Sequence, residues 1–486
     1  MFGWLVHKKG KIMQICTLIL AAGKGTRMPS ANPKALQTVL GEAMLSHVYQ
    51  TAAYVSSSVW TVIGHKAELV EKHLNKEFGE AAGSHCVLQT KQLGTGHAVL
   101  CAMEKIKDSI GVENTKILIL NADVPLIKKE LLEEFIEKAK DYPLSFISLL
   151  LDSGQNYGRV MRENFRKNVQ HAPIKTHTEN TGNVAQIIEA KDFRLAYPGS
   201  EIFEVNSGIY LVDAKVLLEY LPKLSNSNAG KEYYLTDIIS LAKKENIPVE
   251  AFCFENAKAL LGVNNPLELN QAEEILQQEI NLSLMQNGVV MHNPQSIRIS
   301  PFAVIQRGVE IFGPCEIYGK SEIESFTTIN SHCVIKNTKI GENCVVQSFC
   351  HFENAAVGNN AKLGPYARLR PEAKLADDVH LGNFCEIKKS VIGTGSKVNH
   401  LSYIGDSQVG SGVNVGAGCI TCNYDGKNKH RTIIGDNAFL GSNCAFVAPV
   451  KIAKNTLVGA GSVITKDTAE NDLAIARARQ VNIKKR

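Results

Sequence analysis

The pattern of hydrophobic and polar positions along this 486-residue chain changes near residue 289. Before that point, short apolar runs alternate with stretches in which apolar residues recur at helical spacing. The apolar runs include residues 15–20, 58–63, 116–120 and 144–151, and the helical stretches include residues 96–107 and 129–140. This alternation predicts a Rossmann-like α/β domain over residues 13–262, in which helices cover a mostly parallel sheet.

A different period governs the chain beyond residue 289. An isoleucine recurs every six residues from Ile299 to Ile335, and the aliphatic repeat continues to Ile464 after shifts of phase. Neither a helix nor a flat sheet has this period, whereas a parallel β-helix stacks the same side chain in every turn. Glycine often follows the aliphatic residue and would allow tight corners. We therefore predict a β-helix of hexapeptide repeats over residues 289–466, preceded by a helical linker (263–288) and followed by a tail (467–486).

Composition excludes several classes of protein. Lysine plus arginine (53) exceed aspartate plus glutamate (48) by five, a surplus too small to favour nucleic acid as a partner. No stretch approaches the roughly 20 apolar residues of a membrane helix, so no membrane insertion is expected. The twelve cysteines are scattered along the chain, which favours reduced thiols and a cytoplasmic protein.

Residues 1–12 match no functional pattern and are interpreted as an N-terminal extension. Lysines precede the apolar run at residues 12–20 and mimic the start of a signal peptide, but polar residues interrupt this run. The glycine-rich segment that follows is better explained as part of a binding site. Met1 and Met13 are both candidate start sites.

A candidate phosphate-binding loop follows the first apolar run. The sequence LAAGKGTRM occupies residues 20–28, and Lys34 comes shortly after it. Glycines let backbone amides approach phosphate oxygens, while Arg27 and Lys34 supply positive charge. The spacing is not that of a Walker motif, and the third glycine of the dinucleotide fingerprint is missing. Taken alone, the loop also fits a simple glycine-rich turn between a strand and a helix.

A candidate metal ligand follows another apolar run. Asp123 lies just beyond residues 117–120, at the carboxyl end of a predicted strand. Ligands of α/β sheets bind at this edge, and a carboxylate there can hold Mg²⁺ against a triphosphate. The alternative is an aspartate that caps a helix.

Together these segments resemble the sugar-nucleotide pyrophosphorylases, in particular the bifunctional N-acetylglucosamine-1-phosphate uridyltransferase family. The matching sequences are LAAGKGTRM (20–28), QLGTGH (92–97), NADVPL (121–126), VNSG (205–208) and GVNN (262–265). The resemblance implies transfer of UMP from UTP to N-acetylglucosamine-1-phosphate, with Mg²⁺ held by Asp123 and Asn264. The implied contacts to UTP and UDP-N-acetylglucosamine are Leu20, Ala21, Ala22, Gly23, Lys34, Gln89, Gly94, Thr95, Asn121, Ala122, Asp123, Gly158, Glu189, Asn206 and Asn264.

This chemistry needs no protein nucleophile, because the phosphate of the sugar attacks the α-phosphorus of UTP and pyrophosphate leaves. Mg²⁺, Arg27 and Lys34 would accelerate it by positioning and charge neutralisation. The chain departs from the family at two places. Asn121 stands where a tyrosine is expected, and the polar segment at residues 162–183 looks longer than usual. We expect this segment to be a surface excursion; the alternative is that it alters access of the substrate.

The six-residue repeat is interrupted most strongly between residues 419 and 432. The sequence NYDGKNK at residues 423–429 predicts a polar loop that projects from the β-helix. Such a loop on a rigid scaffold often builds a binding site, although a tolerated insertion would look the same.

The C-terminal region resembles the acetyltransferase domain of the same family, a left-handed β-helix that forms a homotrimer. The matching sequences are ARLRP (367–371), GNFCEIKK (382–389), HLSY (400–403) and ITCNYDG (420–426). The resemblance implies that Arg370, Lys388, Tyr403, Asn414 and Lys429 bind the phosphate of glucosamine-1-phosphate. The implied contacts to acetyl-CoA are Ala417, Asn423, Tyr424, Ser442, Ala460 and Arg477.

His400 is the candidate general base for acetyl transfer. The ammonium group of glucosamine-1-phosphate must lose a proton before its nitrogen attacks the thioester, and histidine as a residue type suits this task. Without the family match, His400 would be one surface histidine among fourteen. Similarly, Arg477 lies in a basic tail that could simply be frayed, or could meet a phosphate of CoA.

The sequence therefore predicts a bifunctional cytoplasmic enzyme. Its C-terminal domain acetylates glucosamine-1-phosphate, and its N-terminal domain then forms UDP-N-acetylglucosamine, which the resemblance links to bacterial cell-wall and lipopolysaccharide precursors. Two alternatives stay open at this point. The β-helix could serve only as an oligomerisation platform, or the whole chain could be a sugar-nucleotide sensor without activity.

Overall fold

The computed structural model describes residues 6–8, 11–25, 27–152, 154, 156–164, 182–200, 202–255 and 257–485. The chain divides into two compact units, Met1–Ala272 and Glu273–Arg486. Helix α9 (Pro266–Gln286) runs across this boundary, within the region where a helical linker is expected. Most of the expected surface excursion at residues 162–183 lies outside the described residues.

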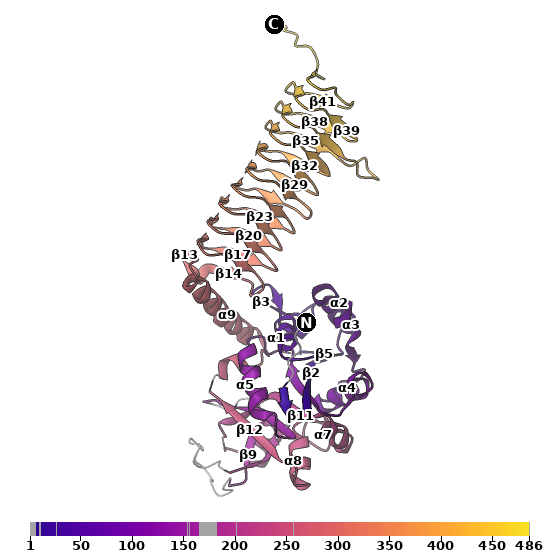
Figure 1. Ribbon diagram of the computed structural model, residues 1–486, viewed down its shortest axis with the longest axis vertical. Helices are drawn as coiled ribbons and strands as arrows, with labels where there is room; N and C mark the ends of the chain where they lie inside the picture. The colour runs from indigo at the N-terminus through magenta and orange to yellow at the C-terminus, as the bar shows by residue number, and fades with distance from the viewer. Residues whose placement is uncertain are drawn as a thin grey trace. The chain divides into compact units, whose positions relative to one another are not determined.

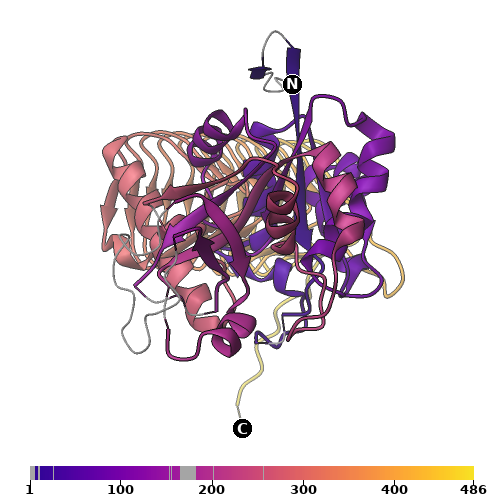
Figure 2. The ribbon, with the colours of Figure 1, turned by 90° about the horizontal axis from the view of Figure 1, so that it is seen from below.

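A mixed sheet forms the centre of the first unit (Figure 2). Its parallel strands lie side by side in the order β7 (Thr115–Asn121), β2 (Lys11–Ala21), β5 (Ser58–Ile63) and β6 (Cys86–Leu88). Strand β2 begins four residues before the expected run at residue 15, and β1 (Val6–Lys8) pairs with it. Part of the expected N-terminal extension therefore belongs to the sheet.

The other half of this sheet contains antiparallel pairs. Strand β11 (Glu204–Asp213) runs antiparallel to β7 and to β8 (Leu144–Leu150), and β12 (Val249–Phe254) runs parallel to β8. Strands β9 (Arg159–Arg162) and β10 (Val184–Ile188) complete the edge. Antiparallel β11 thus brings its own residues beside the carboxyl end of β7.

Helices cover both faces of the sheet. Because successive side chains of a strand point to opposite faces, Ile117 and Ile119 of β7 join one core, and Leu118 and Leu120 join the other. The first core also contains α4 (Thr95–Ile110), α7 (Ala214–Tyr220) and α8 (Asp237–Lys244). The second contains α1 (Met44–Val55), α2 (Ala67–Phe78) and α5 (Lys129–Ala139). Within the described ranges, no helix combines the length and apolar character needed to cross a lipid bilayer.

The second unit is a parallel β-helix (Figure 1). In the part of the chain that the structure describes, it has three sheets of 11, 10 and 9 strands, from β13 (Val290–His292) to β42 (Leu473–Ala474). Each turn adds a strand to each sheet, and successive turns stay in register, as in the pair Ile311 and Ile329. The repeating isoleucines form the buried core of the prism. The six-residue spacing thus corresponds to the step from one sheet-forming segment to the next, and three such segments make up each turn.

The corners of the β-helix are built differently from what we expected. Gly341 and Gly416, which follow aliphatic residues, do not have a positive φ angle. A Cβ atom at Gly341 would lie 2.5 Å from Asn359 Oδ1, and one at Gly416 would lie 2.6 Å from Leu440 O. These glycines therefore allow close packing between turns. The left-handed backbone at the corners belongs mostly to other residues, including Asn343, Asn360, Asn437, Asn443 and Asn455.

Candidate active sites

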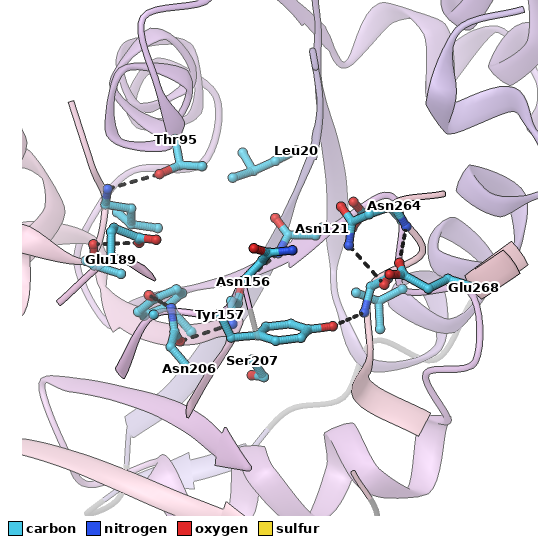
Figure 3. Close-up of a pocket in the computed structure, with 18 of the residues that line it drawn as sticks. Leu20, Thr95, Asn121, Asn156, Tyr157, Glu189, Asn206, Ser207, Asn264 and Glu268 are labelled. Carbon is cyan, nitrogen blue, oxygen red and sulfur yellow. Dashed lines mark hydrogen bonds between the residues drawn. The ribbon is translucent and has the colours of Figure 1, made fainter. Parts of the chain in front are cut away.

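Two adjoining cavities open where β2 and β7 end in the first unit. One is lined by Leu20, Ala21, Gly23, Gly25, Arg27, Lys34, Ala35, Asn121, Ala122, Asp123 and Asn264. The other shares several of these residues and adds Thr95, Asn156, Tyr157, Gly158, Glu189, Asn206 and Glu268 among others (Figure 3). Most residues that the sequence assigns to nucleotide and sugar binding therefore line one continuous region.

The predicted metal ligands Asp123 and Asn264 face the same cationic group. The Lys34 ammonium donates to the Asp123 carboxylate and, at 3.0 Å, to Asn264 Oδ1. Arg27 Nη2 donates to the same Asn264 oxygen at 3.1 Å. Two oxygen ligands of the kind that Mg²⁺ prefers thus converge beside the two basic residues of the glycine-rich segment.

Strand ends and a short loop position Asp123. Strand β7 stops at Asn121, and Ala122 N donates to Leu20 O at 3.1 Å, which ties this end of β7 to the end of β2. Val263 N then donates to Asp123 O at 2.8 Å. Residues 262–264, which are far away in the sequence, are therefore fixed against the aspartate by backbone hydrogen bonds.

The start of helix α9 positions Asn264. Asn265 Oδ1 accepts from Glu268 N at 2.9 Å, and Pro266 occupies the first helical position, as in a capping box. Glu268 Oε2 accepts from Asn264 N at 2.6 Å, while Asn264 Nδ2 donates to Gly262 O at 3.1 Å. These contacts turn Asn264 Oδ1 toward Lys34. Sequence reasoning missed Glu268, although the capping pattern at residues 265–268 would have indicated it.

Gly25 brings Lys34 close to the glycine-rich segment. Its φ angle is +62°, and a Cβ atom there would lie 2.6 Å from Lys34 Cβ. Only glycine fits both the conformation and the contact. Lys34 begins the short 3₁₀ helix η1 (Lys34–Leu36), so its stem is held while its ammonium reaches the cavity. Thr26, next to Gly25, lies outside the described residues.

A polar group of side chains lines the opposite end of the cavity (Figure 3). Thr236 Oγ1 donates to Glu189 Oε1 at 3.0 Å, and Asn206 Nδ2 donates to Tyr210 OH at 2.7 Å. Burial raises the pKa of the Glu189 carboxyl group. Burial also raises the pKa of Tyr157 to about 12, and its hydroxyl accepts from Gly262 N at 3.3 Å. Tyr157 thus links this polar end to the loop that carries Asn264.

A bulge in β11 makes room for Asn121. The pairing of β11 with β8 shifts register between Asn206 and Tyr210. Within this bulge Gly208 has a φ angle of +81°, and a Cβ atom there would lie 2.3 Å from Asn121 Nδ2. Asn121 lines both cavities at the point where they join. The residue that departs from the family pattern therefore faces the predicted ligand directly.

Three residues predicted to contact the nucleotide or sugar do not line either of these two cavities. Gln89 is buried, and its Nε2 donates to Gly94 O at 3.1 Å. Gly94 has a φ angle of +112° and precedes Thr95 at the start of α4. Ala22 is also buried. In this arrangement Gln89 and Gly94 support the turn that presents Thr95.

In the second unit, His400 lies at the exposed end of β31 (Lys397–His400). Its Nδ1 atom is 2.8 Å from Asn383 Oδ1, on the neighbouring strand β28 (His380–Asn383). Because an amide oxygen can only accept, Nδ1 carries the proton in this contact. The Nε2 lone pair is then free to accept a proton.

Basic side chains gather on an adjacent sheet. Lys388 lies on β29 (Glu386–Lys388). The neighbouring Lys429 ammonium lowers the pKa of Lys388, and burial lowers this pKa further. Arg370 Nη1 donates to Glu386 Oε1 at 3.0 Å. Tyr403, on strand β32 (Tyr403–Gly405), folds its ring over Gly405, since a Cβ atom there would lie 2.4 Å from the Tyr403 hydroxyl. Such clustering of like charges suits an anionic ligand.

The residues assigned to acetyl-CoA follow one edge of the β-helix. Asn443 N donates to Ala417 O at 2.7 Å, Gly461 N to Ser442 O at 2.8 Å, and Arg477 Nη1 to Ala460 O at 2.8 Å. Ala417, Ser442 and Ala460 are therefore equivalent positions of successive turns. Asn414, which the sequence assigns to the sugar phosphate, lies on the strand that pairs with β31.

The expected loop projects between β35 (Ile420–Cys422) and β36 (Thr432–Ile434). Asn423 is buried at its base and donates to Asp406. Tyr424 is exposed and forms an isolated β-bridge with Lys429. The bridge holds Lys429 where it can meet Lys388.

Family comparisons agree with this two-part architecture. The MobA-like NTP transferase domain family matches residues 17–178, and the bacterial transferase hexapeptide family (six repeats) matches residues 431–466. The fold and its sites thus define a nucleotidyltransferase joined to a hexapeptide-repeat transferase. This match confirms the predicted α/β nucleotidyltransferase fold and left-handed β-helix.

Curated relatives match along nearly the whole chain. The bifunctional protein GlmU of Oleidesulfovibrio alaskensis is 46% identical over 474 residues, which cover 96% of this chain and 97% of that protein. Those of Nitratidesulfovibrio vulgaris and Lawsonia intracellularis are each 44% identical, again over 96% of this chain and 97% of theirs. The chain belongs to the family of bifunctional GlmU proteins. It is a bifunctional enzyme, a uridylyltransferase and an acetyltransferase.

Proposed function

We propose that the second unit acetylates glucosamine-1-phosphate with acetyl-CoA, and that the first unit then transfers UMP from UTP to the N-acetylglucosamine-1-phosphate formed. The observation that carries this proposal is the presence of two chemically different sites, one on each unit. One joins acidic, amide and basic groups at a sheet edge. The other joins a histidine and a basic cluster on the β-helix.

In the first unit, the chain's own residues would act by positioning and by neutralising charge. Arg27 and Lys34 would bind the phosphates of UTP, beside the backbone of Gly23 and Gly25. The sugar phosphate oxygen attacks the α-phosphorus, and pyrophosphate leaves. Thr95, Gly158, Glu189 and Asn206 line the far end of the cavity and would contact the base and the sugar. Holding reactants in line lowers the barrier without a covalent intermediate.

Asp123 and Asn264 fit a magnesium ion. Their oxygens already meet at one cationic group, and both belong to the cavity that would hold the phosphates. Across the described ranges, no three acidic, histidine or cysteine side chains form a preformed cage. A cation at Asp123 and Asn264 would therefore take its other ligands from phosphates and water, as Mg²⁺ commonly does. When bound, it would offset the charge that develops on the phosphates.

Replacing Glu268 by alanine tests the support of Asn264. This change removes the carboxylate that accepts from Asn264 N at 2.6 Å. A lost hydrogen bond to a charged group costs about 1.5–3 kcal/mol. We expect kcat/KM for uridylyl transfer to fall roughly tenfold to a hundredfold on this basis. Steady-state pyrophosphate release would measure the effect.

Two controls separate this effect from loss of folding. Acetyl transfer by the same variant is expected to stay at the wild-type rate. Glu130→Ala removes an exposed glutamate from the first turn of α5 and should change neither activity. Wild-type uridylyl transfer by the Glu268→Ala protein would refute the positioning role.

In the second unit, His400 would act as the general base. Its Nε2 atom takes a proton from the ammonium group of glucosamine-1-phosphate, while Asn383 holds Nδ1. The free amine then attacks the thioester carbonyl of acetyl-CoA, an amide bond forms, and CoA leaves as its thiol once protonated. Arg370, Lys388 and Lys429 would hold the sugar phosphate. General-base catalysis of this kind contributes roughly 10²–10⁴-fold to a rate.

The lowered pKa of Lys388 predicts how substrate binding depends on pH. Lys388 loses its proton at a lower pH than an ordinary lysine, because Lys429 lies beside it. The KM for glucosamine-1-phosphate should therefore rise as the pH increases through this lowered pKa. Lys429→Met removes the neighbouring charge, so the alkaline rise should move to higher pH while KM itself increases. Acetyl-transfer kinetics between pH 7 and 10.5 would measure both changes.

A matched variant is available in the same loop. Lys427 is exposed, and Lys427→Met removes one positive charge without touching Lys388. Its KM profile should follow that of the wild type. An alkaline rise at the same pH in wild type and Lys429→Met would show that the two ammonium groups do not interact.

We also propose that the enzyme is a homotrimer formed through the β-helix. Phe439, Leu457 and Leu473 stack on adjacent strands and are 50%, 46% and 63% exposed. The rings of Phe349, Tyr366 and Phe384 stack along another edge, with centroids 4.9 and 5.0 Å apart. Contiguous exposed apolar side chains favour a protein partner, and neighbouring copies of the prism would cover them.

The cytoplasm is the compartment that we propose for this enzyme. Its co-substrates UTP and acetyl-CoA are made and used there, and each of its twelve cysteines is a free thiol. An experiment that omits acetyl-CoA tests the proposed order of the two reactions. Glucosamine-1-phosphate and UTP should release little pyrophosphate until acetyl-CoA is added. Rapid pyrophosphate release without acetyl-CoA would contradict the order.

A further inference from the structure

Lys34 binds the same two oxygens that we assign to the metal ion. Its ammonium donates to the Asp123 carboxylate and to Asn264 Oδ1, and its side chain is only 14% exposed. The ammonium is therefore held inside the cavity and paired with the carboxylate. The chain thus already places cationic groups where the ligands converge: the Lys34 ammonium contacts both ligands, and Arg27 Nη2 donates to Asn264 Oδ1 at 3.1 Å.

An ammonium and a divalent ion compete for these ligands. Mg²⁺ binds oxygen at about 2.1 Å, so it would lie within roughly 4 Å of an ammonium on the same oxygens. Like charges at this separation repel, and because the Lys34 and Asp123 side chains are only 14% and 25% exposed, water screens this repulsion incompletely. Binding of the ion to Asp123 and Asn264 is therefore favoured when the Lys34 ammonium moves away from them.

The adjoining space indicates where the ammonium would go. Lys34 lines a cavity together with Gly23 and Gly25, the segment that would hold the nucleotide phosphates. Its Cβ, Cγ and Cδ atoms lie against Gly25, so the stem stays in place and only the Cε and Nζ end of the side chain would swing. A phosphate in this cavity would offer the displaced ammonium new oxygen acceptors.

We propose that Lys34 and the divalent ion exchange places during substrate binding. The ion takes Asp123 and Asn264, and the Lys34 ammonium passes to the phosphates of the nucleotide. Each event favours the other, so metal and nucleotide bind with positive coupling, which by thermodynamic linkage is equal in both directions. This inference rests on the proposed uridylyl-transfer site and adds a role for Lys34 in regulating when that site takes up its metal.

The direct test measures metal binding, not turnover. Mn²⁺ serves as the probe, and its binding to the full-length enzyme is followed by electron paramagnetic resonance with and without UTP. Lys34→Met removes the competing ammonium, so without UTP it should bind Mn²⁺ at least several-fold more tightly than the wild type. The tightening of Mn²⁺ binding that UTP causes should be smaller in Lys34→Met than in the wild type.

Control variants keep the outcome interpretable. Lys129→Met removes a partly exposed lysine of α5 that is paired with Glu133, and it should bind Mn²⁺ like the wild type, which excludes a general effect of net charge. Asp123→Asn should lose the Mn²⁺ site; if it does not, the proposed metal site itself is wrong. If Asp123→Asn loses Mn²⁺ but Lys34→Met binds it no more tightly than the wild type, the exchange is wrong and the metal site stands. Lys34→Gln serves as a second variant if the methionine protein fails to fold.

Discussion

A His400→Ala enzyme is expected to lose acetyl transfer and to keep uridylyl transfer. Alanine removes the imidazole that Asn383 holds where it can take a proton from the substrate ammonium. The loss should be roughly 10²–10⁴-fold in kcat, the usual contribution of a general base. CoA release would measure the first activity, and pyrophosphate release with N-acetylglucosamine-1-phosphate and UTP would measure the second.

Two further variants define the role of the imidazole. His351 is an exposed histidine elsewhere on the β-helix, and His351→Ala should leave both activities unchanged. Asn383→Ala keeps the base but removes the group that fixes its tautomer, so it should fall between the wild type and His400→Ala. Full acetyl transfer by His400→Ala would remove the proposed base from the mechanism.

An Asp123→Asn enzyme is expected to show the opposite pattern, with uridylyl transfer lost and acetyl transfer intact. The change removes the only negative charge among the two predicted metal ligands. Because a bound metal stabilises the transition state by several kcal/mol, we expect a loss of roughly a thousandfold in kcat/KM. Pyrophosphate release across a range of Mg²⁺ concentrations would measure it.

Excess Mg²⁺ should not restore the Asp123→Asn enzyme, since an amide does not replace the charge of the carboxylate. Asp108→Asn, which alters an exposed aspartate of α4, provides the matched control and should behave as the wild type. Substantial uridylyl transfer by Asp123→Asn would show that this carboxylate does not hold the metal.

Periodicity made the two folds predictable, because it reflects burial directly. The isoleucines from Ile299 to Ile335 are spaced by the geometry of the β-helix turn, and all of them lie in its core. Similarly, the apolar run before Asp123 is buried on both faces, as expected of a strand inside a sheet that helices cover on both sides. The family resemblance then supplied Asn264, whose meeting with Asp123 depends on backbone contacts between distant segments.

Other features depend on local geometry that has no periodic signal. The bulge around Gly208 arises from a register shift between β11 and β8. Most left-handed residues at the corners of the β-helix are not glycines, and many of them are asparagines, whereas the sequence predicted that glycine would allow the tight corners. The capping role of Glu268 leaves a short pattern in the sequence, but its contact with Asn264 N follows only from the first turn of α9.

The alternative in which the β-helix only assembles the enzyme gives no reason for its polar cluster. Lys388 and Lys429 come from different turns and still lie close enough to perturb a pKa. Keeping two ammonium groups together is unfavourable, and Asp406, 3.9 Å from the Lys388 ammonium, offsets the repulsion only in part, so the cluster favours an anionic ligand. The exposed His400, held by Asn383, adds a group of the kind that acetyl transfer requires.

The central claim, that each unit carries out its own transfer reaction, is tested most directly by mixing the two inactive variants. Purified His400→Ala and Asp123→Asn enzymes are supplied separately and together with glucosamine-1-phosphate, acetyl-CoA, UTP and Mg²⁺. Each alone should make UDP-N-acetylglucosamine roughly a hundredfold or more slowly than the wild type, and the mixture should make it much faster, because the acetylated sugar phosphate diffuses from one protein to the other. Product formation by either variant alone at a rate near that of the wild type, or a mixture of two folded proteins no faster than the separate variants, would contradict the account.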